Sequence, residues 1–170
     1  MSDEDQEAVQ ALLAQYAARI DKHLRDYLET DGVIGYIQDN TDNGGTEAML
    51  NLVLRTVGRK SGREILVPLL YAAWADEYVI VASKGGADEH PSWYLNLMNR
   101  PEVEWQVLGK RFRGTWRVVE EGQERALLWD YLTRYYSAYA GYQERTDRVL
   151  PIIVLTPTGR LDERWSLPDS

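Results

Sequence analysis

The sequence predicts an α+β protein built on a mostly antiparallel sheet or barrel of about six strands. Three observations predict it: six short segments rich in aliphatic and aromatic residues, short turns between most of them, and helical patterns before and between them. The chain shows no internal repeat and no low-complexity tract. The six predicted strands are residues 49–57, 64–74, 78–83, 102–108, 111–119 and 151–157.

A length of 170 residues is enough for one hydrophobic core, so we expect a single domain over residues 1–170. Residues 1–47 are expected to form an N-terminal helix and a linker, because "QDNTDNGGTE" at 38–47 has the composition of a loop. The barrel is expected over 48–157 and a tail over 158–170.

Three helices are predicted. The first covers residues 3–30, where Ser2 suits an N-cap and Gly32 suits a stop; the second begins at Pro91, and the third covers 122–139. The first helix is amphipathic, because its apolar residues recur at spacings of three and four. These residues are Val9, Leu12, Leu13, Tyr16, Ile20, Leu24, Tyr27 and Leu28.

Turn signals separate the predicted strands. The strand 49–57 ends in the turn "GRKSG", and residues 75–77 connect two further strands tightly. Pro68 lacks an amide donor, so it indicates an edge strand or a bulge. Gly109 and Lys110 lie between two alternating segments and predict a hairpin.

Composition excludes several classes of function. The net charge of −8 argues against general nucleic-acid binding, and the chain has no apolar run long enough to span a membrane. The absence of cysteine removes disulfides and thiolate sites, and His23 and His90 share no ligand spacing, so no metal site is expected. The N-terminus is acidic where a secretory signal would be basic, so the cytoplasm is the expected compartment, with contact to a membrane surface left open.

One basic segment contrasts with the acidic chain. Arg55, Arg59, Lys60 and Arg63 occur with no acid between Arg55 and Arg63. "GRKSG" at 58–62 is not a Walker loop, because Arg precedes the Lys and a strand follows. It is either a charged hairpin turn or a cradle for a phosphate or carboxylate.

A second glycine-bracketed turn, "SKGG" at 83–86, offers similar chemistry. Gly85 and Gly86 permit positive φ, so successive amide N–H groups can converge on an anion, while Ser83 adds a hydroxyl and Lys84 a charge. A plain strand-to-helix loop explains this tetrapeptide equally well. The two basic turns together favour one anionic ligand over a polyanion.

His90 lies near serine and acidic residues, so a hydrolytic triad can be imagined. Sequence neighbours rarely form such a triad, however, and the chain has no nucleophile elbow. We therefore expect His90 to shape the start of the helix that follows Pro91.

Aromatic residues are unusually distributed, with six Trp and eleven Tyr against one Phe. Tyr136, Tyr139 and Tyr142 are three apart, so on a helix they share a face. That face either packs on the sheet or forms an aromatic pocket wall suited to a flat substrate.

Three ordered blocks resemble the signature blocks of the deazaflavin-dependent nitroreductase and quinone reductase family. The blocks are "LRTVGRKSGREILVPLLY", "VIVASKGGADEHPSWYLNL" and "YAGYQERTDRVLPIIVL", and they cover about residues 49–157. The resemblance implies a split β-barrel that binds coenzyme F420. It also implies an oxidoreductase that transfers a hydride from the reduced deazaflavin to a planar electrophile such as a quinone or nitroaromatic.

The resemblance also implies residue roles. The deazaflavin carries a phosphate and an oligoglutamate tail, which require cations. Tyr136, Tyr139, Tyr142 and Ser83 are the implied catalytic residues. Ile65 stands where family members commonly have a basic residue. Arg63 is expected to substitute for that residue, because positions 63 and 65 point to one strand face. The implied cofactor-binding residues are Arg59, Lys60, Arg63, Pro68, Val81, Ser83, Lys84, Gly86, Ser92, Trp93 and Asn96.

Three alternatives stay open from the sequence. An FMN-dependent enzyme of the same barrel type would also use basic turns, a non-catalytic carrier would bind the deazaflavin without turnover, and a scaffold domain would bind nothing. The partner is expected to be a small planar electron acceptor. The physiological acceptor, the choice between monomer and homodimer, and the role of the N-terminal helix are left open.

Overall fold

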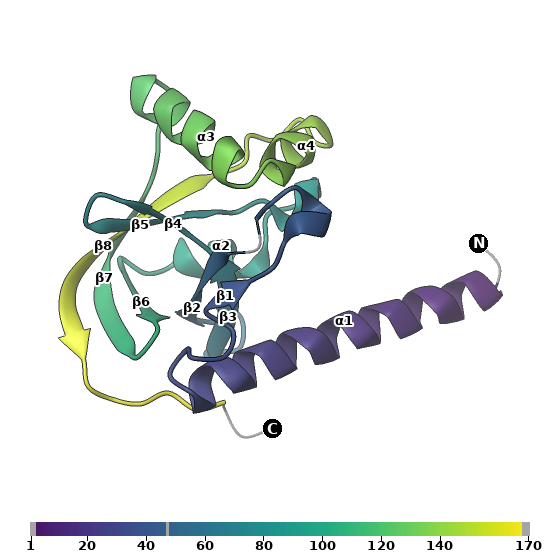
Figure 1. The fold of residues 1–170 in the computed structure, drawn as a ribbon, viewed down its shortest axis with the longest axis horizontal. Helices are drawn as coiled ribbons and strands as arrows, with labels where there is room; N and C mark the ends of the chain where they lie inside the picture. The colour runs from purple at the N-terminus through teal and green to yellow at the C-terminus, as the bar shows by residue number, and fades with distance from the viewer. Residues whose placement is uncertain (1–2, 47, 168–170) are drawn as a thin grey trace.

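The computed structural model describes residues 3–46 and 48–167, which form a curled antiparallel sheet with helices around it (Figure 1). The strands are β1 (Ile37–Gln38), β2 (Met49–Val57), β3 (Glu64–Leu70), β4 (Ala72–Trp74), β5 (Glu77–Val81), β6 (Glu102–Val107), β7 (Lys110–Val118) and β8 (Ile152–Leu161). The helices are α1 (Asp3–Glu29), α2 (Ser92–Leu97), α3 (Gln123–Tyr135) and α4 (Ala138–Glu144), with 3-10 turns η1 (Thr41–Asn43) and η2 (Lys84–Gly86). The predicted α+β class is confirmed.

The two outermost strands of the sheet are connected in the chain by a single residue. Its order is β3, β2, β6, β7, β8, β5 and β4, every pair is antiparallel, and β1 pairs with the start of β2. The first and last strands of this order, β3 and β4, are consecutive in the chain and are separated by Tyr71 alone. The sheet must therefore curl into a barrel with a seam at Tyr71.

The prediction of six strands was wrong in two places. Strand β1 was assigned to the linker, and the segment predicted as 64–74 is two strands. Tyr71 breaks it because its amide still donates to Leu50 in β2 while the next residue, Ala72, already pairs with Val79 in β5. Its buried hydroxyl bonds that of Tyr36 at 2.8 Å, which fixes the seam.

The helix predicted over 122–139 is also two helices. Tyr136 has extended backbone angles (φ −141°, ψ 94°) and ends α3. Immediately after it, the amide and the hydroxyl of Ser137 both donate to the carbonyl of Gly44. The segment predicted as a linker therefore holds the chain at Ser137, and α4 begins there as a separate helix.

Two other boundaries differ from the prediction. Strand β8 runs to Leu161, past the predicted barrel end at residue 157, and Trp165 of the predicted tail is buried against α1. Pro68 lies in β3, which pairs with β2 alone among the described strands, as the prediction of an edge strand requires. The predicted N-cap Ser2 lies outside the described residues.

Two hydrophobic layers share the strands β5 and β8. Ile80 and Ile153 point into the barrel, where they pack with Trp105 and Phe112. The alternate residues point the other way, toward α3 and α4. These outward residues are Val79, Val81, Ile152 and Val154. Because β5 and β8 are buried on both faces over these residues, their sequences there are continuous apolar runs without alternation of polar and apolar residues. The sequence pattern therefore could not show which residues belong to which layer.

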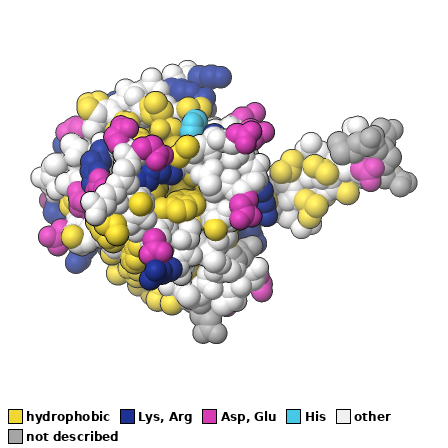
Figure 2. Space-filling view, turned by 90° about the horizontal axis from the view of Figure 1, so that it is seen from above, with side chains coloured by type: hydrophobic (Ala, Val, Ile, Leu, Met, Phe, Trp, Pro, Cys, Tyr) yellow, Lys and Arg dark blue, Asp and Glu magenta, His cyan; other side chains and the backbone are white. Residues whose placement is uncertain are grey.

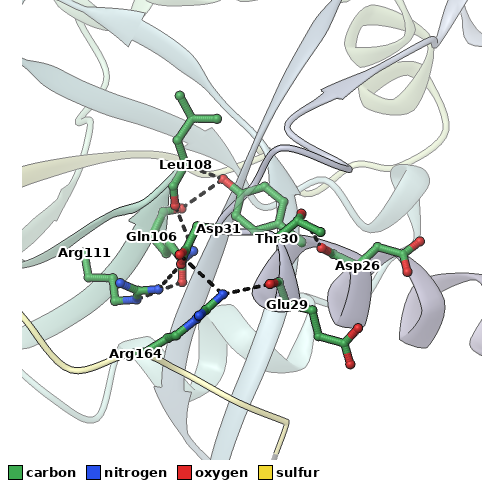
Figure 3. Close-up of polar contacts among 9 residues, drawn as sticks. Asp26, Glu29, Thr30, Asp31, Gln106, Leu108, Arg111 and Arg164 are labelled. Carbon is green, nitrogen blue, oxygen red and sulfur yellow. Dashed lines mark hydrogen bonds and ion pairs between the residues drawn. The ribbon is translucent and has the colours of Figure 1, made fainter.

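The C-terminal end of α1 is anchored to the barrel (Figure 3). Tyr27 is fully buried; its hydroxyl donates to the carbonyl of Asn51 at 3.1 Å and accepts the amide of Leu108 at 3.0 Å. Asp31, just after the helix, pairs with Arg111 of β7 and with Arg164 of the C-terminal segment. The rest of α1 projects away from the barrel (Figure 1). No helix within the described residues is long and apolar enough to cross a membrane.

Gly114 is the position where a side chain would be least tolerated in the barrel. A Cβ there would lie 2.1 Å from the carbonyl oxygen of Thr156 and 2.6 Å from the Trp105 ring. We expect Gly114→Ala to lower the free energy of unfolding by about 2 kcal/mol and the melting temperature by roughly 4–8 °C. Gly159→Ala on the neighbouring strand, where a Cβ meets nothing within 4 Å, is the control. Equal melting temperatures for the two variants would contradict this account.

Candidate functional site

The basic turn 58–62 is tied to helix α2. The Arg59 amide and its Nη1 both donate to the Asn96 side-chain oxygen at 3.1 Å. Gly62 closes the turn with a φ of +69°, and its amide donates to the carbonyl of Gly58. Lys60 and Arg63 are exposed on the turn, so their charges are available to a ligand. Arg59 and Asn96 are therefore placed together, as predicted site residues should be.

The second basic turn has the backbone geometry of an anion-binding loop. Ser83 has right-handed helical angles, and Lys84, Gly85 and Gly86 follow with φ of +47°, +63° and +81°. A right-handed residue followed by a left-handed one turns successive amide N–H groups toward one side, which forms a concavity for anions. Lys84 adopts this conformation without being glycine, so the turn holds backbone strain at a charged residue.

Lys84 is paired with an exchangeable partner. Its Nζ lies 2.8 Å from a carboxylate oxygen of Glu89, and this hydrogen bond lowers the pKa of Glu89. Both side chains are exposed, so the pair contributes little to stability and a ligand carboxylate or phosphate can replace Glu89.

Gly86 brings this turn into contact with the tyrosine-bearing helix α4. A Cβ at Gly86 would lie 2.4 Å from the carbonyl oxygen and 2.9 Å from the Cα of Tyr142. The two backbones therefore touch at a residue that must be glycine. This contact joins two segments that are far apart in the sequence.

Arg148 fixes the same loop from the other side. Its guanidinium donates to the carbonyls of Ala82 at 3.1 Å, Ser83 at 2.7 Å and Ala87 at 2.7 Å. Its Nη1 also lies 3.2 Å from Nδ1 of His90. Burial and the Arg148 charge both lower the pKa of His90, so the ring is neutral and accepts this hydrogen bond. The expectation that His90 shapes the start of the next helix agrees with this contact.

Tyr136, Tyr139 and Tyr142 form one aromatic cluster despite the break between α3 and α4. Their ring centroids are 4.9–6.4 Å apart in edge-to-face arrangements, and the hydroxyls of Tyr136 and Tyr142 are 3.2 Å apart. Tyr136 and Tyr139 are buried with Val81 in the outer hydrophobic layer, while Tyr142 is half-buried. The cluster therefore packs on the sheet, as one of the two sequence alternatives expects, and its role as the wall of a substrate pocket stays a prediction.

Burial keeps the phenols protonated. Loss of solvation raises the pKa of Tyr136 above its usual range, and the hydrogen bond to Tyr142 adds to the shift. Burial likewise raises the pKa of Tyr139. In a hydroxyl pair one oxygen accepts, so the proton of the accepting hydroxyl stays free to donate elsewhere.

The other predicted site residues lie around these contacts. Ser92 is exposed at the first position of α2, and Trp93 is 8% exposed and packs edge-on to Tyr94 at 6.2 Å. Pro68 is half-buried on β3, and no hydrogen bond described in the structure joins it to either basic turn.

Asn96 also borders a cavity of about 450 Å³, which is lined by residues of β2, β6 and β7. Arg55, Arg100 and Arg113 line it, but three glutamates line it as well, so its charge is balanced and it does not continue the basic surface. No cluster of three potential metal ligands occurs within the described residues.

Sequence reasoning missed Arg148 and the linker loop. Arg148 lies in the block "YAGYQERTDRVLPIIVL" but received no role, because its acceptors are backbone carbonyls some 60 residues earlier. The linker residue Gly45 would meet the Tyr136 ring at 3.1 Å if it carried a Cβ, so the loop borders the tyrosine cluster. The basic character of Arg148 was the only available signal.

Comparison with known proteins gives one family. A family model described as F420H(2)-dependent quinone reductase matches residues 29–157. A curated F420H(2)-dependent quinone reductase of Mycobacterium tuberculosis is 41% identical over 108 residues, which cover 62% of this chain and 72% of that protein.

Two solved structures are similar in fold and sequence to this chain. One, described as a domain-swapped dimer, has a TM-score of 0.59 and 32% identity, covering 91% of this chain and 98% of that one. The other, an F420-H2 dependent reductase named FDR-A, has a TM-score of 0.57 and 35% identity, covering 71% of this chain and 97% of that one.

The contact between Gly86 and Tyr142 predicts a sharp difference between two adjacent glycines. Gly85→Ala meets nothing within 4 Å and carries only the cost of a positive φ, about 1 kcal/mol. Gly86→Ala carries the same cost and must also push α4 away. We expect Gly86→Ala to increase trypsin cleavage after Lys84 and Arg145 far more than Gly85→Ala does. Similar cleavage rates would show that the two backbones are not held together here.

Proposed function

The chain belongs to the F420H(2)-dependent quinone reductase family, and on that premise we propose that it transfers a hydride from reduced coenzyme F420 to a quinone. One observation carries the proposal: the backbone contact between Gly86 and Tyr142 joins the anion-binding turn to the tyrosine cluster. Groups suited to a phosphorylated cofactor and groups suited to a planar acceptor therefore lie side by side. Family membership also favours F420 over FMN and an enzyme over a carrier.

The residues present fit such a cofactor. The concavity at Ser83–Gly85 and the Lys84 charge suit a phosphate, and the exposed cations of the 58–63 turn suit the carboxylates of an oligoglutamate tail. Asn96 would connect these two regions through its bond to Arg59. Ile65 is half-buried beside Gly58, so Arg63 supplies the nearest exposed charge on that turn. Ser92, Trp93, Pro68 and Val81 would border the cofactor.

When bound, reduced F420 supplies the hydride and its ring stabilises the charge that remains. The protein supplies position, water exclusion and a proton. Tyr136 and Tyr142 would hold a proton at the free hydroxyl of their pair, where it can stabilise the oxygen of an acceptor as negative charge develops. Tyr139 would keep that wall rigid and dry, and the Ser83 hydroxyl would add a second donor. A nitroaromatic acceptor has similar planar geometry and forms part of the proposal.

We also propose that residues 1–170 act as one domain and that the protein is a homodimer. The domain is supported by the described C-terminal segment, which packs on α1. The homodimer is supported by the likeness to a solved structure described as a domain-swapped dimer. A cytoplasmic location stays part of the proposal.

Charge removal at the two basic turns tests the cofactor assignment. Lys60→Ala and Lys84→Ala should each weaken F420 binding about tenfold, because each removes a charge-assisted contact. The measurement is quenching of deazaflavin fluorescence, followed at two salt concentrations. Lys110→Ala removes an exposed lysine from the β6–β7 hairpin and should leave affinity unchanged. Unchanged affinity in the double variant Lys60→Ala/Lys84→Ala would rule out the cradle.

Removal of single hydroxyls tests the proton donors. Tyr136→Phe and Tyr142→Phe should lower kcat for quinone reduction by about a hundredfold, the lower end of the range for a lost proton donor, with F420 binding intact. Tyr131→Phe on α3, whose hydroxyl donates to the carbonyl of Ala73, is the control.

The pH dependence of the wild-type enzyme follows from the raised pKa values. Because burial raises the pKa of Tyr136 and Tyr139 above the usual value of about 10, kcat should show no loss from phenol ionisation up to that pH. A fall in kcat near pH 8 that is absent in Tyr136→Phe would contradict the assignment.

A further inference from the structure

The N-terminal part of α1 does not pack on the barrel. Every described side chain over residues 5–19 is exposed, and burial begins only with Leu24. At about 1.5 Å per residue, the 27 residues of α1 extend for roughly 40 Å. The exposed part, residues 5–19, is as short as isolated helices that are only marginally stable in water, since most helix stability comes from packing of an apolar face. The projecting segment therefore needs a partner surface.

The segment carries a continuous apolar stripe (Figure 2). Val9 is 42% exposed, Leu12 65%, Leu13 56% and Tyr16 57%. The spacing 9, 13, 16, 20 continues through the half-exposed Ile20 toward the buried end of the helix. Alternating intervals of four and three are the heptad pattern of a helix that packs on another helix.

Charge along α1 indicates which partner fits. Residues 3–16 contain four acids and no Lys or Arg, while residues 17–25 contain Arg19, Lys22 and Arg25 against one acid. An interfacial membrane helix needs cations beside its apolar face, and the projecting segment has none before Arg19. A second copy of α1 in antiparallel orientation places the acidic half of each helix against the basic segment of the other. A parallel pair would place acid against acid.

We propose that the exposed stripe of α1 binds the same stripe of a second copy as an antiparallel two-helix coiled coil. In this register Val9 faces Ile20 of the other copy, and Leu13 faces Tyr16. The inference specifies the interface of the homodimer and rests on that part of the proposed function. It can be tested separately from the cofactor site, because none of the proposed site residues lies on α1, and α4 lies at the other end of the barrel from the anchored end of α1 (Figure 1).

A charged residue in the stripe tests the surface. Leu13→Glu should weaken dimerisation by about a hundredfold in sedimentation velocity, because two buried leucines are lost from one interface. Gln15→Glu adds the same charge on the opposite side of the helix and should leave the dimer intact. Binding of F420 should be unchanged in both variants, which separates this result from failure of the cofactor assignment.

The absence of cysteine makes the orientation directly testable. The double variant Val9→Cys/Ile20→Cys should form an intermolecular disulfide, because facing positions bring the Cα atoms within the roughly 4–7 Å that a disulfide needs. Val9→Cys alone and Ile20→Cys alone should stay uncrosslinked.

Three results would overturn the inference. A crosslink in Val9→Cys alone would show parallel helices. A dimeric Leu13→Glu variant would leave the homodimer standing but remove α1 as its interface. A monomeric wild-type protein that binds vesicles of neutral lipid would show that the stripe contacts a membrane, and would overturn the homodimer as well.

Discussion

The close approach of the Gly86 and Tyr142 backbones is the constraint on which the rest of the site depends. Gly86 ends the loop that holds the predicted anion-binding residues, and Tyr142 of α4 is one of the two predicted proton donors. Because Gly86 has no side chain, the two backbones meet at van der Waals distance. Arg148 holds the same loop in place by hydrogen bonds to three of its backbone carbonyls. In the proposed function, the Gly86–Tyr142 contact and the Arg148 hydrogen bonds would together set the separation between cofactor and acceptor. Hydride transfer is sensitive to such separations, because misplacement by about 1 Å can cost a hundredfold in rate.

The barrel makes this arrangement rigid. Val81, Tyr136 and Tyr139 belong to the outer hydrophobic layer, so the acceptor wall is a continuation of the core. The same strands bury their alternate residues inside the barrel. Movement of the wall would disturb both layers, and a close-packed interior resists such movement. The exposed cations lie outside these two layers, and in the proposed function Lys84 would exchange Glu89 for a ligand anion.

The two ends of the molecule have separate roles in this account. Helices α3 and α4 cover the end that carries the chemistry, and α1 is anchored at the other end by Tyr27 and Asp31 (Figures 1 and 3). An antiparallel pair of α1 helices would join two barrels through a segment that carries none of the proposed site residues. Association and catalysis can therefore be altered independently by substitution.

The sequence by itself determined most of the strands, the hairpin at Gly109 and the glycine-flanked basic turns, because each follows from local periodicity or backbone preference. Tyr139 and Tyr142 lie on one helix, as their spacing predicts, whereas Tyr136 joins them across the break between α3 and α4. It also carried the family resemblance, on which the roles of the site residues still rest. Only the tertiary structure decided the breaks at Tyr71 and Tyr136, the role of Arg148 and the projection of α1. The first three share a physical reason: each depends on a partner distant in the chain, such as Leu50 for Tyr71 or Gly44 for Ser137 beside Tyr136. The projection of α1 follows from where the barrel anchors its C-terminal end, through Tyr27 and Asp31. Local patterns of polarity cannot identify a backbone carbonyl acceptor, since every residue has one.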